Sequence, residues 1–418
     1  MTKEEKTNVP KIRFPGFTDS WEYRKIGECL SEITYGFTNP MSDTECGPWK
    51  ITAKDIVNGT INFTTARHTS KEEYNRLTDK SKPLIGDLLL TKDGTLGRTA
   101  IVNTGNICIN QSVALLRFKE QICSVQYAKT LLDSPLYQRQ MLDDAGGGTI
   151  KHIYITKVDK MLVPIPSINE QNQLASYFDS INNFITLHQR KLDQIKEYKK
   201  GLLQKMFPKD GETVPEIRFP GFTGDWEQSK LGELMDVTSV KRIHQSDWTD
   251  SGIRFLRARD IVAASKNEEV TEPLYISTDK YNEYSAISGK VKIGDLLVTG
   301  VGSIGVPMLI KSDEPLYFKD GNIIWFKNDN SIEGSFFFHS FMGTGIQNYI
   351  HESSGKGTVG TYTIDSGKKT PILLPKTKEE QAKIGGFFDD LDNVIILHQR
   401  KLEKMKEYKK GLLQQMFV

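Results

Sequence analysis

The sequence predicts an α/β (α+β) protein in which two mixed α/β globules are each followed by one long helix. The two helices are expected to pair as an antiparallel coiled coil, which gives the chain a pseudo-two-fold internal repeat. Three observations support this prediction: a long internal repeat, an apolar spacing of about 3.5 residues at the end of each copy, and strand-and-turn patterns before it.

The repeat is strongest at the two ends of each copy. PKIRFPGFTDSWEYRKIGE from Pro10 recurs as PEIRFPGFTGDWEQSKLGE from Pro215. HQRKLDQIKEYKKGLLQKMF from His188 recurs as HQRKLEKMKEYKKGLLQQMF from His398. The displacement of 205 to 210 residues indicates a tandem duplication and not an array of small units.

Two weaker matches lie inside the copies. KDIV from Lys54 matches RDIV from Arg259, and GDLLLTKDGTLG from Gly86 matches GDLLVTGVGSIG from Gly294. The remaining interiors differ, which predicts two globules with one frame and different surface chemistry.

Short apolar runs bounded by Gly, Pro, Asn and Asp fill the first part of each copy. Examples are SKPLIGDLLLTKDG from Ser81, ICINQSVALLRFK from Ile107 and PLYFKDGNIIWFK from Pro315. Such runs are typical of strands joined by turns, and a helical interval is expected near residues 124–142. Each globule is therefore predicted to be a mixed α/β fold of about 160 residues.

An apolar seam with alternating steps of four and three residues runs through the end of each copy, as in coiled coils. Pro164 and Pro166 prevent an earlier start of the first helix, Pro371 and Pro375 do the same for the second, and Pro208 ends the first. This seam is also a candidate surface for partner docking. In the first copy it comprises Leu174, Phe178, Ile181, Ile185, His188, Leu192, Ile195, Leu202 and Met206. In the second copy it comprises Ile384, Phe388, Leu391, Ile395, His398, Leu402, Met405, Leu412 and Met416.

The two seams are expected to bury each other, and the helices run antiparallel if a two-fold axis relates the copies. The predicted boundaries are 1–166 for the first globule, 167–208 for the first helix, 209–375 for the second globule and 376–418 for the second helix. Lys199 and Lys409 also lie in the seam. A polar seam residue, His188 and His398 included, fixes helix register more often than it docks a partner.

The composition is that of an ordinary globular protein, with a net charge of +2 and positive charge concentrated in residues 188–209 and 398–418. No run of ~18 apolar residues and no signal-peptide pattern occurs, so we expect a cytoplasmic protein without a membrane segment. No CxxC pair occurs, and the cysteines are predicted to be small buried apolar residues: Cys29, Cys46, Cys108 and Cys123.

Two similar globules related by a two-fold axis suit duplex DNA, whose strands have the same symmetry. Dimeric DNA readers place equivalent elements ~34–36 Å apart, and a long helix pair can hold two globules at about that separation. Because the interiors of the copies differ, the two DNA half-sites are expected to differ in sequence.

Four features together resemble the specificity subunits of type I restriction–modification systems. They are the IRFPGFTxxWexxkLGE frame, the GDLL-T-x-x-G-T/S-x-G hairpin, the PIPSINEQ segment before the helix and the HQRKL…YKKGLLQ-x-MF end. The resemblance covers essentially the whole chain. It implies that the globules are target recognition domains, each reading one half of a bipartite DNA site, and that the paired helices fix the gap between the half-sites.

The resemblance also implies the partners. Two adenine-N6 methyltransferase subunits would dock on the helices, and an ATP-driven restriction (endonuclease) subunit can join the complex. This chain itself would be non-catalytic and without a cofactor or metal. S-adenosylmethionine is expected on the methyltransferase subunit, and ATP with Mg on the restriction subunit.

DNA-reading residues are expected where the two copies disagree, because a shared residue is better explained by a structural role. Asn and Gln suit adenine, whereas Arg and Lys suit guanine or phosphate. The candidates are Tyr35, Lys54, Lys92, Arg98, Asn110, Gln111, Lys151 and His152 in the first globule, and Lys241, Arg242, Arg257, Arg259, Lys319 and Lys356 in the second. The TKDGTLGR turn remains open to a second reading, as an ordinary surface turn.

Several motifs have simpler interpretations than their first appearance suggests. GVGSIG from Gly300 matches a dinucleotide fingerprint, but a strand-like VPMLI follows it, which favours a hairpin turn. The EYK triplets from Glu197 and Glu407 imitate nuclease motifs but lie within predicted helices. The FPGF segments from Phe14 and Phe219 are expected to pack at the start of each globule.

Two further points stay open. The basic stripe on the helices is a solvated face or a contact for phosphate or an acidic partner; it consists of Lys196, Lys200, Lys406 and Lys410. The alternative function is a coiled-coil scaffold that joins protein partners without DNA readout.

Overall fold

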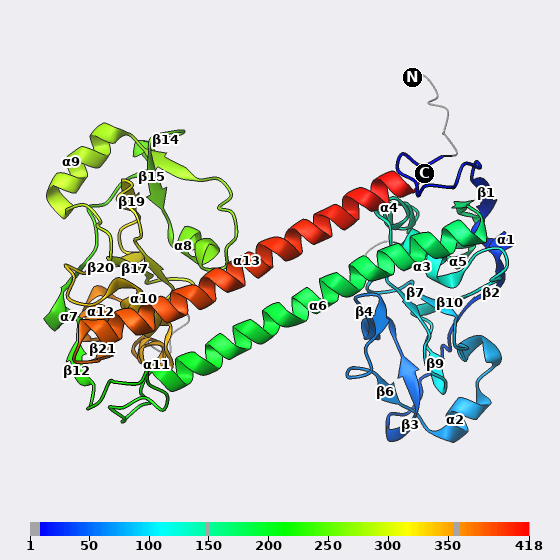
Figure 1. The fold of residues 1–418 in the computed structure, drawn as a ribbon, viewed down its shortest axis with the longest axis horizontal. Coiled ribbons are helices and arrows are strands. Elements are labelled where there is room, and N and C mark those ends of the chain that lie inside the picture. Colours follow the sequence, from blue (N-terminus) through cyan, green and yellow to red (C-terminus); the bar gives the residue numbers. More distant parts are fainter. Residues whose placement is uncertain (1–8, 148–150, 355–359, 418) are drawn as a thin grey trace. The chain divides into compact units, whose positions relative to one another are not determined.

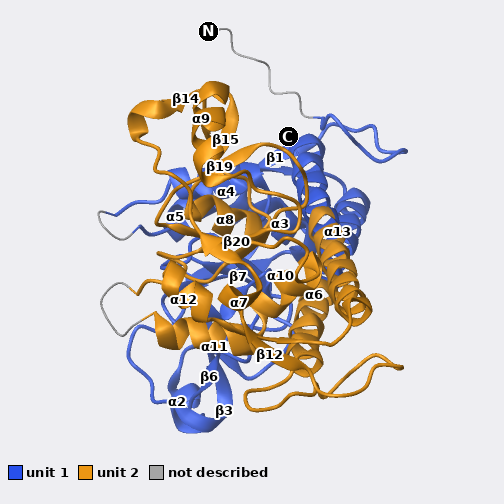
Figure 2. Cartoon of the chain, turned by 90° about the vertical axis from the view of Figure 1, so that its left-hand side faces the viewer, with its two compact units in different colours: residues 1–188, 401–418 blue, residues 189–400 orange. Residues whose placement is uncertain are grey.

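The structure is a computed structural model that describes residues 9–147, 151–354 and 360–417 (Figure 1). The chain divides into two compact units: unit 1 comprises residues 1–188 and 401–418, and unit 2 comprises residues 189–400 (Figure 2). Each unit contains strands and helices, and each long helix contributes to both units. The predicted mixed α/β class is confirmed.

Unit 1 is built on two sheets. The four-stranded antiparallel sheet has the order β2 (Leu30–Tyr35), β10 (Val113–Phe118), β7 (Leu88–Thr91) and β8 (Thr99–Ile101). The three-stranded sheet has the order β6 (Arg67–His68), β3 (Thr44–Ile51) and β9 (Ile107–Ile109), in which β3 and β9 are parallel.

Unit 2 repeats this topology and adds one edge strand to its second sheet. Its first sheet has the order β13 (Asp236–Thr238), β20 (Ile323–Lys327), β17 (Leu296–Thr299) and β18 (Pro307–Leu309). Its second sheet has the order β14 (Trp248–Thr249), β16 (Leu274–Ile276), β15 (Ile253–Leu256) and β19 (Leu316–Phe318), in which β15 and β19 are parallel. The internal repeat is therefore also a repeat of strand order.

Helix pairs cover the first sheet of each unit. They are α3 (Val125–Leu132) with α4 (Pro135–Asp143), and α10 (Gly334–Met342) with α11 (Thr344–Ser353). The expected helical interval near residues 124–142 is thus two helices. Ser124 caps α3 by accepting the Tyr127 N–H, and Pro135 begins α4, where its missing N–H costs nothing.

Short strand pairs lead into the long helices. They are β1 (Glu22–Lys25) with β11 (Leu162–Ile165), and β12 (Glu227–Lys230) with β21 (Pro371–Leu374). The remaining helices and strands are α1 (Ile26–Cys29), η1 (Ala53–Asp55), β4 (Ile56–Val57), β5 (Thr60–Ile61), α2 (Lys71–Arg76), η2 (Asp79–Ser81), α5 (Ile155–Lys160), α7 (Leu231–Leu234), η3 (Gln245–Asp247), α8 (Ala258–Ser265), α9 (Thr278–Ser288) and α12 (Ile364–Lys369).

The long helices α6 (Ile168–Met206) and α13 (Lys378–Met416) have 39 residues each (Figure 1). In unit 2, Lys199 Nζ lies 2.5 Å from Asp392 Oδ1, and the rings of Phe207 and Phe388 are 6.0 Å apart. The partner number falls from Lys199 on α6 to Phe207 just after it, so this coiled coil is antiparallel, as predicted. No helix among the described residues is long and apolar enough to cross a membrane.

A buried ion pair joins each FPGF segment to the start of a long helix. Arg13 donates two hydrogen bonds to Glu170, at 2.7 and 2.8 Å, and Arg218 donates two to Glu380, at 2.6 and 2.9 Å. Phe14 and Phe219 pack against the cores of their units. The structural role expected for these segments is confirmed.

The cysteine prediction is correct at three positions and wrong at one. Cys29, Cys108 and Cys123 are buried, and burial raises the pKa of the Cys108 thiol to about 12. Cys46 is exposed. It lies where the pairing of β3 with β6 shifts register between Thr44 and Trp49, and this irregularity turns the segment out of the sheet.

Candidate nucleic-acid interface

Five segments of unit 1 meet at one end of its first sheet, around Ser112. The Ser112 carbonyl oxygen accepts the backbone N–H of Lys92 at 2.9 Å and of Asp93 at 3.3 Å. Ser112 Oγ accepts the Ala53 N–H at 3.0 Å, and Gln111 N–H donates to the Phe37 carbonyl at 2.8 Å. We call this surface interface 1; it comprises residues 35–38, 52–56, 92–98, 110–112 and 151–152.

A charged cluster lies in interface 1. Asp93 accepts Lys92 Nζ at 2.6 Å and His152 Nδ1 at 2.6 Å. The Lys92 ammonium also lies 5.5 Å from the centre of the Tyr35 ring, within cation–π range. The structure thus brings together three of the residues proposed from the sequence, which are separated by up to 117 positions along the chain.

Asn110 and Gln111 are adjacent but differ in what they can offer a ligand. Asn110 Oδ1 accepts both the N–H and the hydroxyl of Ser112, at 3.1 and 2.5 Å, so its carbonyl serves the turn. Gln111 is exposed, and its side-chain amide forms no hydrogen bond within the described residues. Gln111 is therefore the more available of the two for contact with a base.

The other candidates of unit 1 lie at the margin of interface 1. Lys54 is exposed on η1. Arg98 is exposed and donates to the Ile56 carbonyl at 3.2 Å, which holds it beside η1. Lys151 is exposed next to His152.

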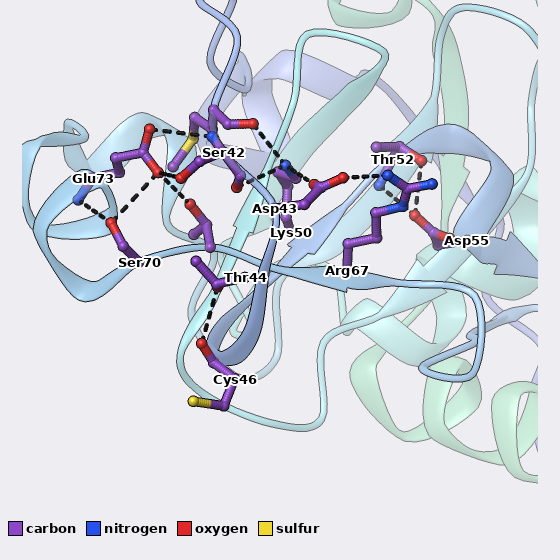
Figure 3. A network of polar contacts seen from close by, with 12 residues as sticks. Ser42, Asp43, Thr44, Cys46, Lys50, Thr52, Asp55, Arg67, Ser70 and Glu73 are labelled. Carbon is purple, nitrogen blue, oxygen red and sulfur yellow. Dashed lines mark hydrogen bonds and ion pairs between the residues drawn. The ribbon is translucent and has the colours of Figure 1, made fainter.

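Cations on the neighbouring three-stranded sheet are already engaged (Figure 3). Asp43 pairs with Lys50, at 2.5 Å, and with Arg67, and these hydrogen bonds lower the pKa of the Asp43 carboxyl. Glu73 accepts the Ser42 hydroxyl, and this bond lowers the pKa of Glu73. The network fixes the segment that precedes Thr52 and leaves Lys50 and Arg67 less free to bind a ligand.

The candidates of unit 2 follow the equivalent strands. Lys241 and Arg242 follow β13, Arg257 follows β15 and Lys319 follows β19. Their backbones are joined, because Lys319 N–H donates to the Leu256 carbonyl at 2.8 Å and Tyr317 Oη donates to the Lys241 carbonyl at 2.9 Å. We call this surface interface 2; it comprises residues 239–242, 257–261, 300–306 and 319–320.

The three arginines of interface 2 are paired with carboxylates. Arg242 pairs with Asp320 at 2.8 Å but keeps an exposed side chain. Arg257 and Arg259 both pair with the buried Asp260, at 3.4 and 3.8 Å. Lys356 lies outside the described residues.

GVGSIG forms a hairpin turn, as predicted. It joins the antiparallel strands β17 and β18, and no helix follows it. A dinucleotide site of the fingerprint type requires a helix N-terminus at this position. Among the described residues, no group of three or more His, Cys, Asp or Glu side chains is arranged to hold a metal ion.

The predicted seam residues are buried or half-buried on the long helices. In unit 1 they are Leu174, Phe178, Ile181, Ile185, His188, Leu402, Met405, Leu412 and Met416; in unit 2 they are Leu192, Ile195, Leu202, Met206, Ile384, Phe388, Leu391, Ile395 and His398. The stripe lysines Lys196, Lys200, Lys406 and Lys410 are exposed.

The long helices also expose large apolar side chains at equivalent positions of the repeat. In unit 1 these are Phe184, Leu187 and Tyr408, and in unit 2 they are Val394, Leu397 and Tyr198. Leu187 and Leu397 are 62% and 64% exposed. We call these sets apolar patch 1 and apolar patch 2.

Sequence reasoning missed two organising residues, Asp93 and Ser112. Asp93 lies 59 positions before His152, and an isolated β-bridge between the two brings them together. No local pattern reports such a bridge. The disagreement between the copies at position 93 was the available signal, because Val301 occupies the equivalent place in GVGSIG.

Comparison with known proteins agrees with this architecture. The chain is 23% identical to the MjaVIII specificity subunit of a type I restriction enzyme from Methanocaldococcus jannaschii, over 94% of this chain and 91% of that protein. It is 26% identical to the EcoBI specificity subunit from Escherichia coli, over 50% of this chain and 44% of that protein.

The fold is also similar to a crystal structure of the type I restriction–modification S subunit from M. genitalium. The TM-score is 0.63 at 15% identity, over 98% of this chain and 99% of that chain. A sequence profile described as "Type I restriction modification DNA specificity domain" matches residues 19–197 and 223–407, one match in each copy. This chain belongs to the type I restriction–modification DNA specificity domain family.

Proposed function

We propose that this chain is a DNA specificity subunit that reads a bipartite sequence, one half through interface 1 and the other through interface 2. One observation carries the proposal: the same loop positions gather at the same sheet end in both units, yet hold different side chains. A shared frame with different contact groups reads two different half-sites. The scaffold alternative gives no reason for that divergence.

Partner subunits supply the chemistry in this proposal. Apolar patches 1 and 2 are equivalent surfaces, and each would dock one adenine-N6 methyltransferase subunit, giving two copies. S-adenosylmethionine would be held by those subunits, and ATP with Mg by a restriction subunit where one is present. This chain would itself be non-catalytic, without cofactor, and would act in the cytoplasm.

Genome-wide mapping of N6-methyladenine tests the proposal. Cells that carry the chain and its methyltransferase are expected to methylate a two-part motif with an unread spacer, and cells without the chain are expected to lose that motif. An unchanged methylation pattern after deletion would contradict the proposal.

The helix pair is proposed to set the spacer length. Deleting one heptad from each helix, at residues 189–195 and 399–405, keeps the seam in phase, leaves both apolar patches intact and shortens the pair by ~10 Å. At ~3.4 Å per base pair, the spacer should shorten by about three base pairs while both half-sites persist. A motif with its original spacer would refute this role of the helices.

Salt dependence separates DNA reading from a scaffold function. Binding of the full chain to duplex DNA should weaken steeply as salt concentration rises, because released counterions drive phosphate contacts. A scaffold would show no retardation of duplex DNA in a gel shift at any salt concentration.

A further inference from the structure

Asp93 joins two side chains that can contact a base. Its carboxylate accepts Lys92 Nζ and His152 Nδ1, each at 2.6 Å. The backbone fixes the same groups, because Asp93 and His152 form a β-bridge and Ile153 N–H donates to the Lys92 carbonyl at 2.9 Å. The side chains of Lys92, Asp93 and His152 are 17%, 22% and 42% exposed, so the cluster is held in place and still reaches the surface.

The cluster keeps hydrogen-bonding capacity for a ligand. The Lys92 ammonium has three N–H groups, and one of them points to Asp93. His152 uses Nδ1 for Asp93, which leaves Nε2 as the ring nitrogen for a ligand. Guanine presents two acceptors, O6 and N7, on its major-groove edge, and lysine is among the side chains that read them.

We propose that Lys92, Asp93 and His152 form a guanine-reading group in unit 1, with Asp93 as its positioning residue. This inference rests on the DNA-reading function proposed above. A free lysine binds any phosphate, but a carboxylate at 2.6 Å offsets its charge and repels phosphate. The lysine therefore favours a ligand with neutral acceptors in a fixed position, which is what a guanine edge offers.

Unit 2 has no counterpart of this group. The equivalent positions hold Gly300, Val301 and Thr361. A side chain at Gly300 would place its Cβ 2.7 Å from the Tyr362 carbonyl oxygen, so the backbone there leaves no room for a lysine. The half-site read by unit 2 is consequently an internal control for the half-site read by unit 1.

Selection from a randomised duplex library tests the proposal, with the full chain purified together with its methyltransferase subunit. In Lys92→Met, one G·C position of one half-site should lose about fivefold to a hundredfold of its preference, and the other half-site should stay unchanged. The unchanged half-site shows that the variant is folded and bound to DNA.

Asp93→Asn separates positioning from simple structural support. This variant should relax the same G·C position and bind random duplex more tightly than wild type, with a salt-dependence slope steeper by about one. The control is Thr361→Ala, because Thr361 is the residue of unit 2 at the position equivalent to His152. This variant should leave that G·C position unaffected.

Three results would overturn the guanine-reading group: an unchanged motif in Lys92→Met, equal losses in both half-sites, or no gain of random-duplex affinity in Asp93→Asn. A wild-type complex that selects no two-part motif is a different result. It would refute the proposed function itself.

Discussion

The two units share the strand order of their first sheets, but they differ in the polar groups that connect each globule to the long helices. In unit 1, Glu170 accepts Arg13 and also Trp21 Nε1, at 3.1 Å. In unit 2, Glu380 accepts Arg218, while Trp226 Nε1 is buried and without a hydrogen-bond partner among the described residues. The apolar core and the polar contacts that join it to the long helices have therefore diverged separately since the duplication.

A second difference lies where the helices meet the globules. In unit 2, Lys199 pairs with Asp392, and the buried His339 contacts Asp389 at 3.3 Å. In unit 1 the equivalent positions hold Lys409, Asn182 and Thr130. Burial there lowers the pKa of Lys409, whose nearby carboxylates are Asp133 and Asp179.

The largest expected effect comes from breaking the buried ion pairs. Glu170→Ala and Glu380→Ala should each cost about 3–5 kcal/mol, because an arginine that is only 11–12% exposed is left without its carboxylate. Glu170→Ala should cost about 1–3 kcal/mol more, since it also leaves the Trp21 N–H unpaired.

Native-state hydrogen exchange measures these two losses separately. Protection should fall in β1 and β11 for Glu170→Ala, and in β12 and β21 for Glu380→Ala. Equal losses in the two units would show that the Trp21 hydrogen bond adds nothing to the stability of unit 1.

The next effect concerns the Lys199–Asp392 pair. Asp392→Asn should cost about 1–2 kcal/mol of unfolding free energy, between the values for exposed and buried pairs, because the two side chains are 14% and 32% exposed. The reciprocal change, Asn182→Asp, gives Lys409 a carboxylate at the position that Asp392 holds beside Lys199, and should stabilise unit 1 by up to about 1 kcal/mol.

Urea denaturation measures both changes, with Asp390→Asn as the control on an exposed neighbouring position. The control should change the unfolding free energy by less than about 0.5 kcal/mol. A destabilised Asn182→Asp would mean that the environment of Lys409 does not reproduce that of Lys199.

These differences also show how far the sequence alone reaches. The repeated frame could be predicted because its apolar residues recur at regular spacings. The alternating steps of four and three residues from Leu174 and the apolar runs of β7 and β10 are local patterns. The pairs Asp93–His152 and Arg13–Glu170 are not local, since the fold joins positions 59 and 157 residues apart. The reading residues were inferred from disagreement between the copies, which gives their segments but not their partners.

His339 should make the stability of unit 2 sensitive to acid. The side chain is fully buried against Phe388, near Lys199, Asp389 and Asp392, and burial lowers the pKa of His339 below its ordinary 6.5. Ser335 and Lys311 contact Asp389 from the other elements packed there. Below pH 6.5 the histidine binds a proton in the unfolded state but stays neutral in the folded state. The free energy of unfolding therefore decreases as pH falls, by at most about 1.4 kcal/mol per pH unit.

Hydrogen exchange of unit 2 between pH 7.5 and 5.5, corrected for intrinsic rates, follows this loss. His339→Gln should flatten the slope in unit 2 and leave unit 1 unchanged, where Thr130 holds the equivalent position. Asp389 affects the stability of unit 2 only in a lower pH range, because its hydrogen bond with His339 lowers the pKa of Asp389. A slope that persists in His339→Gln would exclude His339 as its source.

The smallest effect should be equal in the two units, because it concerns a turn that both copies kept. Gly94 and Gly302 have φ of 79° and 72° in the hairpins after β7 and β17, and a Cβ at either position would meet no atom within 4 Å. Gly94→Ala and Gly302→Ala should therefore each cost about 1 kcal/mol through backbone conformation alone. Gly201→Ala, on α6 with open space around its Cβ, should instead stabilise by up to about 1 kcal/mol. Urea denaturation compares the unfolding free energies of the three variants. A loss in Gly94→Ala that clearly exceeds the loss in Gly302→Ala would show that the first turn is constrained by its neighbours Lys92 and Asp93 as well as by its own backbone.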